Sequence, residues 1–279
     1  MQTITDPVQM KKKAIDLRRD VLKMLMEAGS GHTGGSLSII EILVSLYYGR
    51  MNLNPGIFGS RERDKFVLSK GHACPALYAV LADQGYFPKK ELGTLRKLGS
   101  RLQGHPQFGL PGLEISSGSL GQGLSVANGF ALADRMDGTD ARVYCLMGDG
   151  ETNEGQVWEA AMTAAHYKLD NLCAIIDYNR LQIDGQTCEV KDLGEFREKW
   201  DKFGWFTVEV DGHDVEQLGK AFDQVKDIKG QPQIVIAHTV KGRGVSFIEN
   251  RVEWHGIAPK PDDLEKALIE LDEQEKALL

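Results

Sequence analysis

The sequence predicts one α/β domain over residues 1–279, built on a mostly parallel sheet with helices on both faces. Short apolar runs at 142–147, 172–178, 205–210 and 233–238 are separated by segments with helical periodicity. Continuous apolar strands that alternate with amphipathic helices are typical of a parallel sheet buried on both sides. The length suits one large core, and no repeat or low-complexity linker divides the chain.

The elements follow from local signals in chain order. Asp6-Pro7 supplies a cap and a first position for a helix over 8–28, which ends at Gly29. The other expected helices lie at 36–50, from Gly71-His72 toward 84–85, at 120–136, 154–168, 192–203 and 214–227, and from about 262. A short buried strand is expected at 65–69, in addition to the four apolar runs.

Composition excludes several classes of protein. A net charge of −7 gives no electrostatic footprint for nucleic acid or for an anionic membrane. The start resembles no secretory signal, and no apolar run approaches a membrane span. The cysteines form no C-x-x-C pair, so we expect core residues in a reducing cytoplasm at Cys74, Cys145, Cys173 and Cys188.

Ligands of parallel sheets collect where the strands end, and two oxygen-bearing side chains follow consecutive strands there. Asp149 lies between Gly148 and Gly150, and Asn179 follows the next strand. Such oxygens suit Mg²⁺ or Ca²⁺, and the flanking glycines would let a phosphate approach the backbone, near the start of the helix at 154. Alone, Gly-Asp-Gly is most often an ordinary turn. Together with Asn179, a metal–phosphate site and a plain turn remain equally open.

Four histidines lie in glycine-rich loop contexts, namely His32, His72, His105 and His255. Any one of them is most simply a surface or capping residue, but four in one domain favour acid–base or hydroxyl contacts with a sugar-like substrate. Their spacing does not fit a zinc site. We interpret His166, His213 and His238 as structural. The small-residue loop at 116–123 is either a close-approach surface for a flat ring or another subunit, or a flexible connection.

Together these stretches resemble the N-terminal part of transketolase, a thiamine-diphosphate enzyme that moves two-carbon ketol units between sugar phosphates. The matching segments span nearly the whole chain in order: GSGHTGGSLS (29–38), SKGHACPALYAVL (69–81), LQGHP (102–106), SSGSLGQGLSVANGFALA (116–133), GDGETNEGQVWEAA (148–161), DYNRLQIDG (177–185) and EWHG (253–256). The resemblance implies the diphosphate-binding (PP-type) fold of this superfamily and a transferase of the pentose phosphate pathway.

The resemblance also implies roles for individual residues. It assigns a divalent metal, Mg²⁺ or Ca²⁺, to Asp149, Asn179 and the carbonyl of Leu181. It assigns thiamine-diphosphate contacts to His72, Gly118, Ser119, Leu120, Gly148, Asp149, Gly150, Glu154, Asn179 and His255, with Glu154 also in a subunit-contact network. It assigns catalytic contacts with substrate to His32, His72, His105 and His255, of which His32 and His255 manage the proton of the donor's C3 hydroxyl.

Three departures from the family pattern stand out. Ser119 and Thr33 occupy positions where many transketolases have proline. More importantly, the chain stops before the pyrimidine-binding and C-terminal domains, which carry the glutamate that activates the cofactor and the arginines that grip the substrate phosphate. We therefore expect the N-terminal subunit of a split transketolase, completed by a partner chain in a heterotetramer of two copies of each. The alternatives are another thiamine-diphosphate carboligase or decarboxylase, for an unusual or sulfonated ketose or a 2-oxo acid, and a non-catalytic module.

Overall fold

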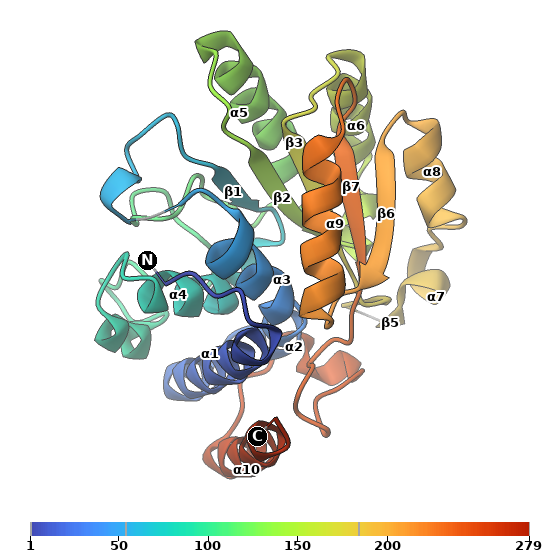
Figure 1. Ribbon diagram of the computed structural model, residues 1–279. Coiled ribbons are helices and arrows are strands. Elements are labelled where there is room, and N and C mark those ends of the chain that lie inside the picture. Colours follow the sequence, from blue (N-terminus) through green and yellow to red (C-terminus); the bar gives the residue numbers. More distant parts are fainter. Residues whose placement is uncertain (1, 54, 184, 279) are drawn as a thin grey trace.

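The computed structural model describes residues 2–53, 55–183 and 185–278. It confirms the predicted architecture, because five parallel strands form one sheet in the order β1-β2-β3-β7-β6 (Figure 1). The strands are β1 (Lys65–Leu68), β2 (Val143–Gly148), β3 (Leu172–Tyr178), β6 (Phe206–Asp211) and β7 (Gln233–His238). A small antiparallel ribbon of β4 (Leu181–Gln182) and β5 (Gly185–Gln186) follows β3 and was not predicted.

Helices bury both faces of the sheet. Along β2, Tyr144 and Leu146 pack into one apolar core, whereas Cys145 and Met147 pack into the other. The first core is covered by α1 (Pro7–Ala28), α3 (Ile40–Ser45), α4 (Cys74–Asp83), α9 (Val215–Asp227) and α10 (Pro261–Lys276). The second is covered by α5 (Gly123–Asp137), α6 (Gly155–His166) and α8 (Phe196–Lys202). In Figure 1, α9 crosses in front of the sheet, and α1 and α10 lie side by side below it.

Short helical elements connect these layers. They are α2 (Thr33–Leu37), η1 (Leu46–Arg50), η2 (Pro55–Ile57), η3 (Gly71–Ala73), η4 (Lys89–Thr94), η5 (Gly150–Asn153), α7 (Thr187–Lys191) and η6 (Val252–His255). Three of the described cysteines are buried free thiols as expected, but Cys188 on α7 is exposed. Among the described residues, no helix is both long and apolar enough to cross a bilayer.

The predicted helix at 36–50 is wrong in detail, because the chain breaks it at Ser38 and Ile39 into α2 and α3. The Ser38 hydroxyl donates to the carboxylate of Asp177, at 2.7 Å, and to the carbonyl of Gly35. A serine that bonds to a distant buried acid favours a local bend over a continuous helix. The break therefore places α2 against the end of the sheet.

Several other predicted helices begin later than expected. The helix predicted at 120–136 starts at Gly123, because the amide of Gly121 is already bound by Glu151. The helix predicted at 192–203 starts at Phe196, because Gly194 adopts a left-handed conformation (φ 58°) and its amide donates to Asp192. The helix predicted from 154 begins at Gly155, after the 3₁₀ turn η5.

Strand register brings the predicted site residues to one edge. Gly148 at the end of β2 pairs with Asp177 of β3, and Asp177 pairs with Ala237 of β7. The segments that follow these three strands therefore leave the sheet side by side. Ligand sites of open parallel sheets typically lie at this carboxyl edge.

Candidate functional site

A cavity of about 370 Å³ lies at this carboxyl edge of the sheet. The predicted site residues that line it are His32, His72, His105, Gly118, Leu120, Gly148, Asp149, Gly150, Glu154, Asn179, Leu181 and His255. Ser119 is not among them: it is exposed, and its hydroxyl accepts a hydrogen bond from Gln122. Gly118 (φ 150°) lies against the ring of His105, and this leaves the next side chain outside the cavity.

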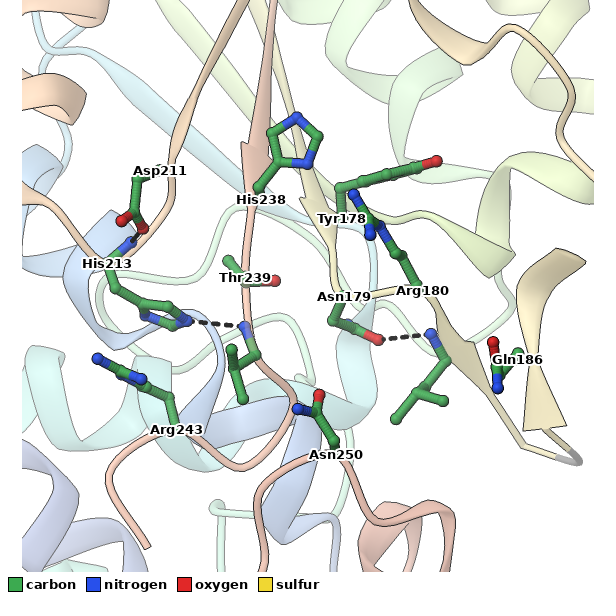
Figure 2. A pocket seen from close by; sticks show the side chains of 12 residues that line it. Tyr178, Asn179, Arg180, Gln186, Asp211, His213, His238, Thr239, Arg243 and Asn250 are labelled. Atoms are coloured by element: carbon green, nitrogen blue, oxygen red, sulfur yellow. Dashed lines mark hydrogen bonds between the residues drawn. The ribbon is translucent and has the colours of Figure 1, made fainter. Parts of the chain in front are cut away.

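The three oxygens expected to bind a metal lie together between β2 and β4. Asp149 is 1% exposed, and its carboxylate accepts the amides of Gly150, at 2.7 Å, and Arg180. Asn179 Oδ1 accepts the amide of Leu181 at 3.1 Å (Figure 2). Burial, and next the neighbouring Asp177 carboxylate, raise the pKa of Asp149 to about 7. A buried acid held only by backbone amides is an environment that a cation would stabilise.

Among the described residues, no zinc-type cluster competes with this set. Within the described ranges, no group of three or more His, Cys, Asp or Glu side chains could hold a metal. A metal at this edge would therefore combine one carboxylate with neutral oxygens, as hard cations such as Mg²⁺ and Ca²⁺ accept.

Two buried lysines were missed by the sequence analysis. Lys70, 2% exposed, pairs with Asp177 and donates to the carbonyl of Gly35 at 3.2 Å. Lys241 is also 2% exposed, and its Nζ lies 2.8 Å from Nδ1 of His255 and 3.5 Å from the carbonyl of Leu181. Burial, followed by the charge of Lys70, lowers the pKa of Lys241 to about 8. Both lysines follow strands closely, which is the signal that could have identified them.

Lys241 adds positive charge to the cavity that the fold does not neutralise. No ion pair joins it to an acidic side chain among the residues that the structure describes. A buried cation of this kind favours an anionic ligand, because an isolated charge inside a protein is otherwise costly. His213, held between Glu41 (3.0 Å) and the amide of Val240 (2.7 Å), fixes the loop that carries Lys241 (Figure 2).

The four loop histidines converge, although they come from segments up to about two hundred residues apart. Ring centroids lie 5.2 Å apart for His32 and His72, 5.5 Å for His32 and His255, and 6.0 Å for His32 and His105. Nδ1 of His32 is buried without a hydrogen-bond partner in the described part of the chain.

These rings are neutral near pH 7. Burial, then His105 and Arg96, lower the pKa of His32 to about 4. Burial, then Lys241, lower the pKa of His255 to about 3. Burial also lowers the pKa of His72 well below its usual range and lowers that of His105. Neutral imidazoles offer both a donor and an acceptor to hydroxyl groups, and can accept a proton from one.

Glu151 holds the small-residue loop against the end of β2. Its carboxylate accepts the Ser69 hydroxyl, the amide of Gly121 at 2.9 Å and the amide of Gly148 at 2.9 Å. The amide of Gly148 is thus already used, so Gly148 lines the cavity without a free donor. The loop at 116–123 is therefore tied to the sheet, and the interpretation as a flexible connection is wrong.

A second, more open pocket of about 720 Å³ adjoins the cavity (Figure 2). Asn179 and Leu181 line both. Its histidines are already engaged by the protein, since His238 contacts Glu209 at 2.6 Å and His213 is held as described. This supports the interpretation of both as structural residues, whereas the four loop histidines line the other cavity.

Comparisons with known proteins agree with this geometry. The family model described as "Transketolase, thiamine diphosphate binding domain" matches residues 10–276. The chain is 42% identical over 274 residues to a subunit of the apulose-4-phosphate transketolase of Phocaeicola vulgatus, covering 98% of this chain and 96% of the relative. It is 42% identical to 6-deoxy-6-sulfo-D-fructose transketolase subunit SqwG of Clostridium sp., covering 96% and 98%.

Larger relatives match this chain over only part of their length. Human transketolase is 41% identical over 276 residues, which are 97% of this chain but 44% of the human protein. A transketolase structure from Pichia stipitis superposes with a TM-score of 0.87 at 32% identity, over 94% of this chain and 40% of that one. The chain thus spans less than half of these transketolases and nearly all of the two smaller relatives. By sequence, fold and the residues gathered at its cavity, the chain belongs to the transketolase thiamine-diphosphate-binding domain family.

Proposed function

We propose that this chain is the diphosphate-binding subunit of a two-chain transketolase, which transfers a two-carbon ketol unit from a ketose to an aldose. The observation that carries the proposal is the convergence of four neutral histidines, a buried lysine and the oxygens of Asp149, Asn179 and Leu181 on one cavity. The histidines distinguish this function from that of a 2-oxo acid decarboxylase, because they suit a polyhydroxylated substrate.

The cavity fits the cofactor that the family implies. Asp149, with its raised pKa and its backbone-only contacts, suits Mg²⁺ or Ca²⁺ together with Asn179 and the Leu181 carbonyl. Lys241 and His255 suit the diphosphate. A Cβ at Gly150 would lie 2.9 Å from Cβ of Gln182, so glycine allows the turn after β2 to pack closely against β4 at the cavity. Glu154 lies exposed at the N-cap of α6, where a second polypeptide can reach it.

When bound, thiamine diphosphate supplies the carbon nucleophile and the electron sink that cleavage between C2 and C3 of a ketose needs. The chain's own residues supply proton transfer and orientation. His32 and His255, which both line the cavity and have lowered pKa values, accept and return the proton of the donor's C3 hydroxyl. His72 and His105 orient the donor's terminal hydroxyl, with the ring of His105 held against Gly118.

The site requires a second polypeptide. Because two relatives that this chain covers almost completely are named as transketolase subunits, we infer that a partner carries the pyrimidine-binding domain and the arginines for the substrate's acidic group. A heterotetramer with two copies of each chain would give two such sites. The names of two relatives contain a phosphorylated and a sulfonated sugar, which supports a ketose with an acidic group as donor. Four free cysteines support a reducing cytoplasm as its location.

The proposal is tested by co-purifying the chain with a partner that carries a pyrimidine-binding domain. Ketol transfer is then assayed with and without thiamine diphosphate and Mg²⁺. We expect activity from the pair in the presence of both additions, and none from either chain alone. Bound cofactor without ketol transfer to any aldose would favour another carboligase or decarboxylase. A pair that binds no cofactor would indicate a non-catalytic module.

A further inference from the structure

Asp177, near the end of β3, is a heavily hydrogen-bonded side chain beneath the cavity, and no assigned role accounts for it. Its carboxylate is fully buried (0% exposed) and accepts from four side chains. Oδ2 accepts the amide Nδ2 of Asn179 at 2.9 Å, the hydroxyl of Ser38 at 2.7 Å and the ammonium of Lys70. Oδ1 accepts the hydroxyl of Thr239.

The contact with Asn179 decides which way that amide faces. A carboxylate only accepts hydrogen bonds, so it must meet the NH₂ group of Asn179 and not the carbonyl. The opposite orientation would place an oxygen 2.9 Å from a carboxylate oxygen, which is repulsive. With the NH₂ group held by Asp177, Oδ1 turns to the opposite side, where it accepts the amide of Leu181 (Figure 2). The adjacent amide of Arg180 donates to Asp149.

Lys70 offsets the free-energy cost of burying this carboxylate. A buried carboxylate is costly unless it is paired and hydrogen-bonded, and Lys70 lies against Asp177 with 2% of its own surface exposed. The pair is electrically neutral overall. Asp177 therefore holds Asn179 without adding a net negative charge to the metal end of the cavity.

We propose that Asp177 is a positioning residue for the metal site: it orients the Asn179 amide so that its oxygen faces the cation, and Lys70 balances its charge. This inference rests on the proposed function, in which Asp149 and Asn179 hold a divalent metal. Residues that orient a metal ligand in this way typically change metal affinity by about 10–100-fold when they are replaced.

The test separates the acceptor at position 177 from its charge. In K70M/D177N the buried charges are removed, but the amide oxygen introduced at position 177 can still accept from Asn179. In K70M/D177L the shape is similar and the acceptor is lost. Each variant is assembled with the partner chain, and Mg²⁺ affinity is measured at saturating thiamine diphosphate by titration calorimetry. We expect K70M/D177L to bind Mg²⁺ about 10–100-fold more weakly than K70M/D177N.

Matched controls remove other contacts of the same carboxylate. Ser38→Ala and Thr239→Val each delete one donor to Asp177 and leave the Asn179 contact in place. We expect these variants to have a lower unfolding temperature, with Mg²⁺ affinity within about threefold of the wild type. A change of that size is well below the effect expected at position 177. If Mg²⁺ affinity instead falls in step with unfolding temperature across all variants, Asp177 is structural only and the inference is overturned.

The remaining outcomes are also distinct. Equal Mg²⁺ affinity for the asparagine and leucine variants, with a wild-type complex that binds normally, overturns the positioning role alone. A wild-type complex that binds no Mg²⁺ contradicts the proposed function itself. Should K70M/D177L fail to fold, K70M/D177V, whose β-branched side chain suits a strand, is compared in its place.

Discussion

The two ends of the cavity differ in how completely the chain satisfies its own polar groups. At the metal end, Asp149 is held by two backbone amides, Asn179 by Asp177 and Leu181, and Lys241 by His255. At the histidine end, the rings lie 5.2–6.0 Å apart, and Nδ1 of His32 has no partner among the described residues.

This difference indicates that the two ends of the cavity are suited to different kinds of ligand. The metal end is fixed by the fold and presents charge to a ligand that stays in place. The histidine end is kept neutral by burial and leaves donors and acceptors free for groups that arrive and leave. Changes at the metal end should therefore affect cofactor binding, and changes at the histidine end should affect turnover.

The largest effect is expected from Asp149→Ala. The variant loses the one carboxylate of the proposed metal site, so thiamine diphosphate with Mg²⁺ should no longer raise the unfolding temperature of the complex, and ketol transfer should be abolished. Differential scanning fluorimetry with and without cofactor measures the first effect. Asp192→Ala is the control, because Asp192 also accepts a backbone amide (Gly194, 2.9 Å), but in an exposed turn outside the cavity. An unchanged cofactor response in Asp149→Ala would contradict the metal assignment.

His32→Ala should act on turnover instead. General acid–base groups contribute about 10²–10⁴-fold, so kcat should fall by that factor while the dissociation constant for thiamine diphosphate changes little. Steady-state kinetics and cofactor titration of the same preparation measure both quantities. His238→Gln, at the neighbouring pocket, should leave both near the wild-type values. A weakened cofactor affinity with unchanged kcat would mean that the two ends are not separate in function.

Much of this site could be predicted because its signals are local. Apolar runs identify the strands. Because neighbouring parallel strands end at the same edge of the sheet, residues 149 and 179 come together there without any information about distant contacts. Glycine–histidine pairs likewise identify loops. Asp149 and Asn179, which follow consecutive strands, accordingly line one cavity.

The missed residues depend on burial and on contacts between distant segments. Lys70 and Asp177 are 107 positions apart, and each alone is an ordinary charged residue after or near a strand. Ser119 is likewise outside the cavity, because Gly118 (φ 150°) lies against the ring of His105. This contact between distant segments cannot be read from the residue types in the loop. An acid at the end of the buried run LCAIID was the available hint, because it requires a buried partner.

Lys241→Met tests whether the metal end also provides the anion contact. Methionine keeps most of the volume and removes the charge. Hydrogen bonds to charged groups contribute about 1.5–3 kcal/mol, so affinity for thiamine diphosphate should fall by about 10–100-fold at saturating Mg²⁺, with a smaller effect on kcat. Lys220→Met, on the exposed side of α9, is the matched control. Equal cofactor affinity in the two variants would remove Lys241 from the diphosphate site.

The smallest effect concerns acid stability. Burial first, and then nearby positive groups, lower the pKa of His32 to about 4, against about 6.5 for an unfolded histidine. Between these values the unfolded chain binds more protons than the folded one, so this residue makes the fold less stable as pH falls from 6.5 to 4. The raised pKa of Asp149 has the opposite effect on stability as pH falls, but Asp149 is present in both the wild type and the His32 variant compared below.

His32→Phe should therefore flatten the decline in unfolding temperature between pH 6.5 and 4.5. Because His32 is partly exposed, solvent screening reduces the contribution to about 1 kcal/mol, or roughly 2–4 °C for a domain of this size. The measurement is the unfolding temperature of cofactor-free protein across this pH range. His166→Phe, on the exposed end of α6, should leave the slope unchanged. If the unfolding temperatures of wild type and His32→Phe fall in parallel with pH, burial of neutral His32 does not reduce the stability of the fold. The contrast between the two ends of the cavity would then rest on hydrogen bonding alone.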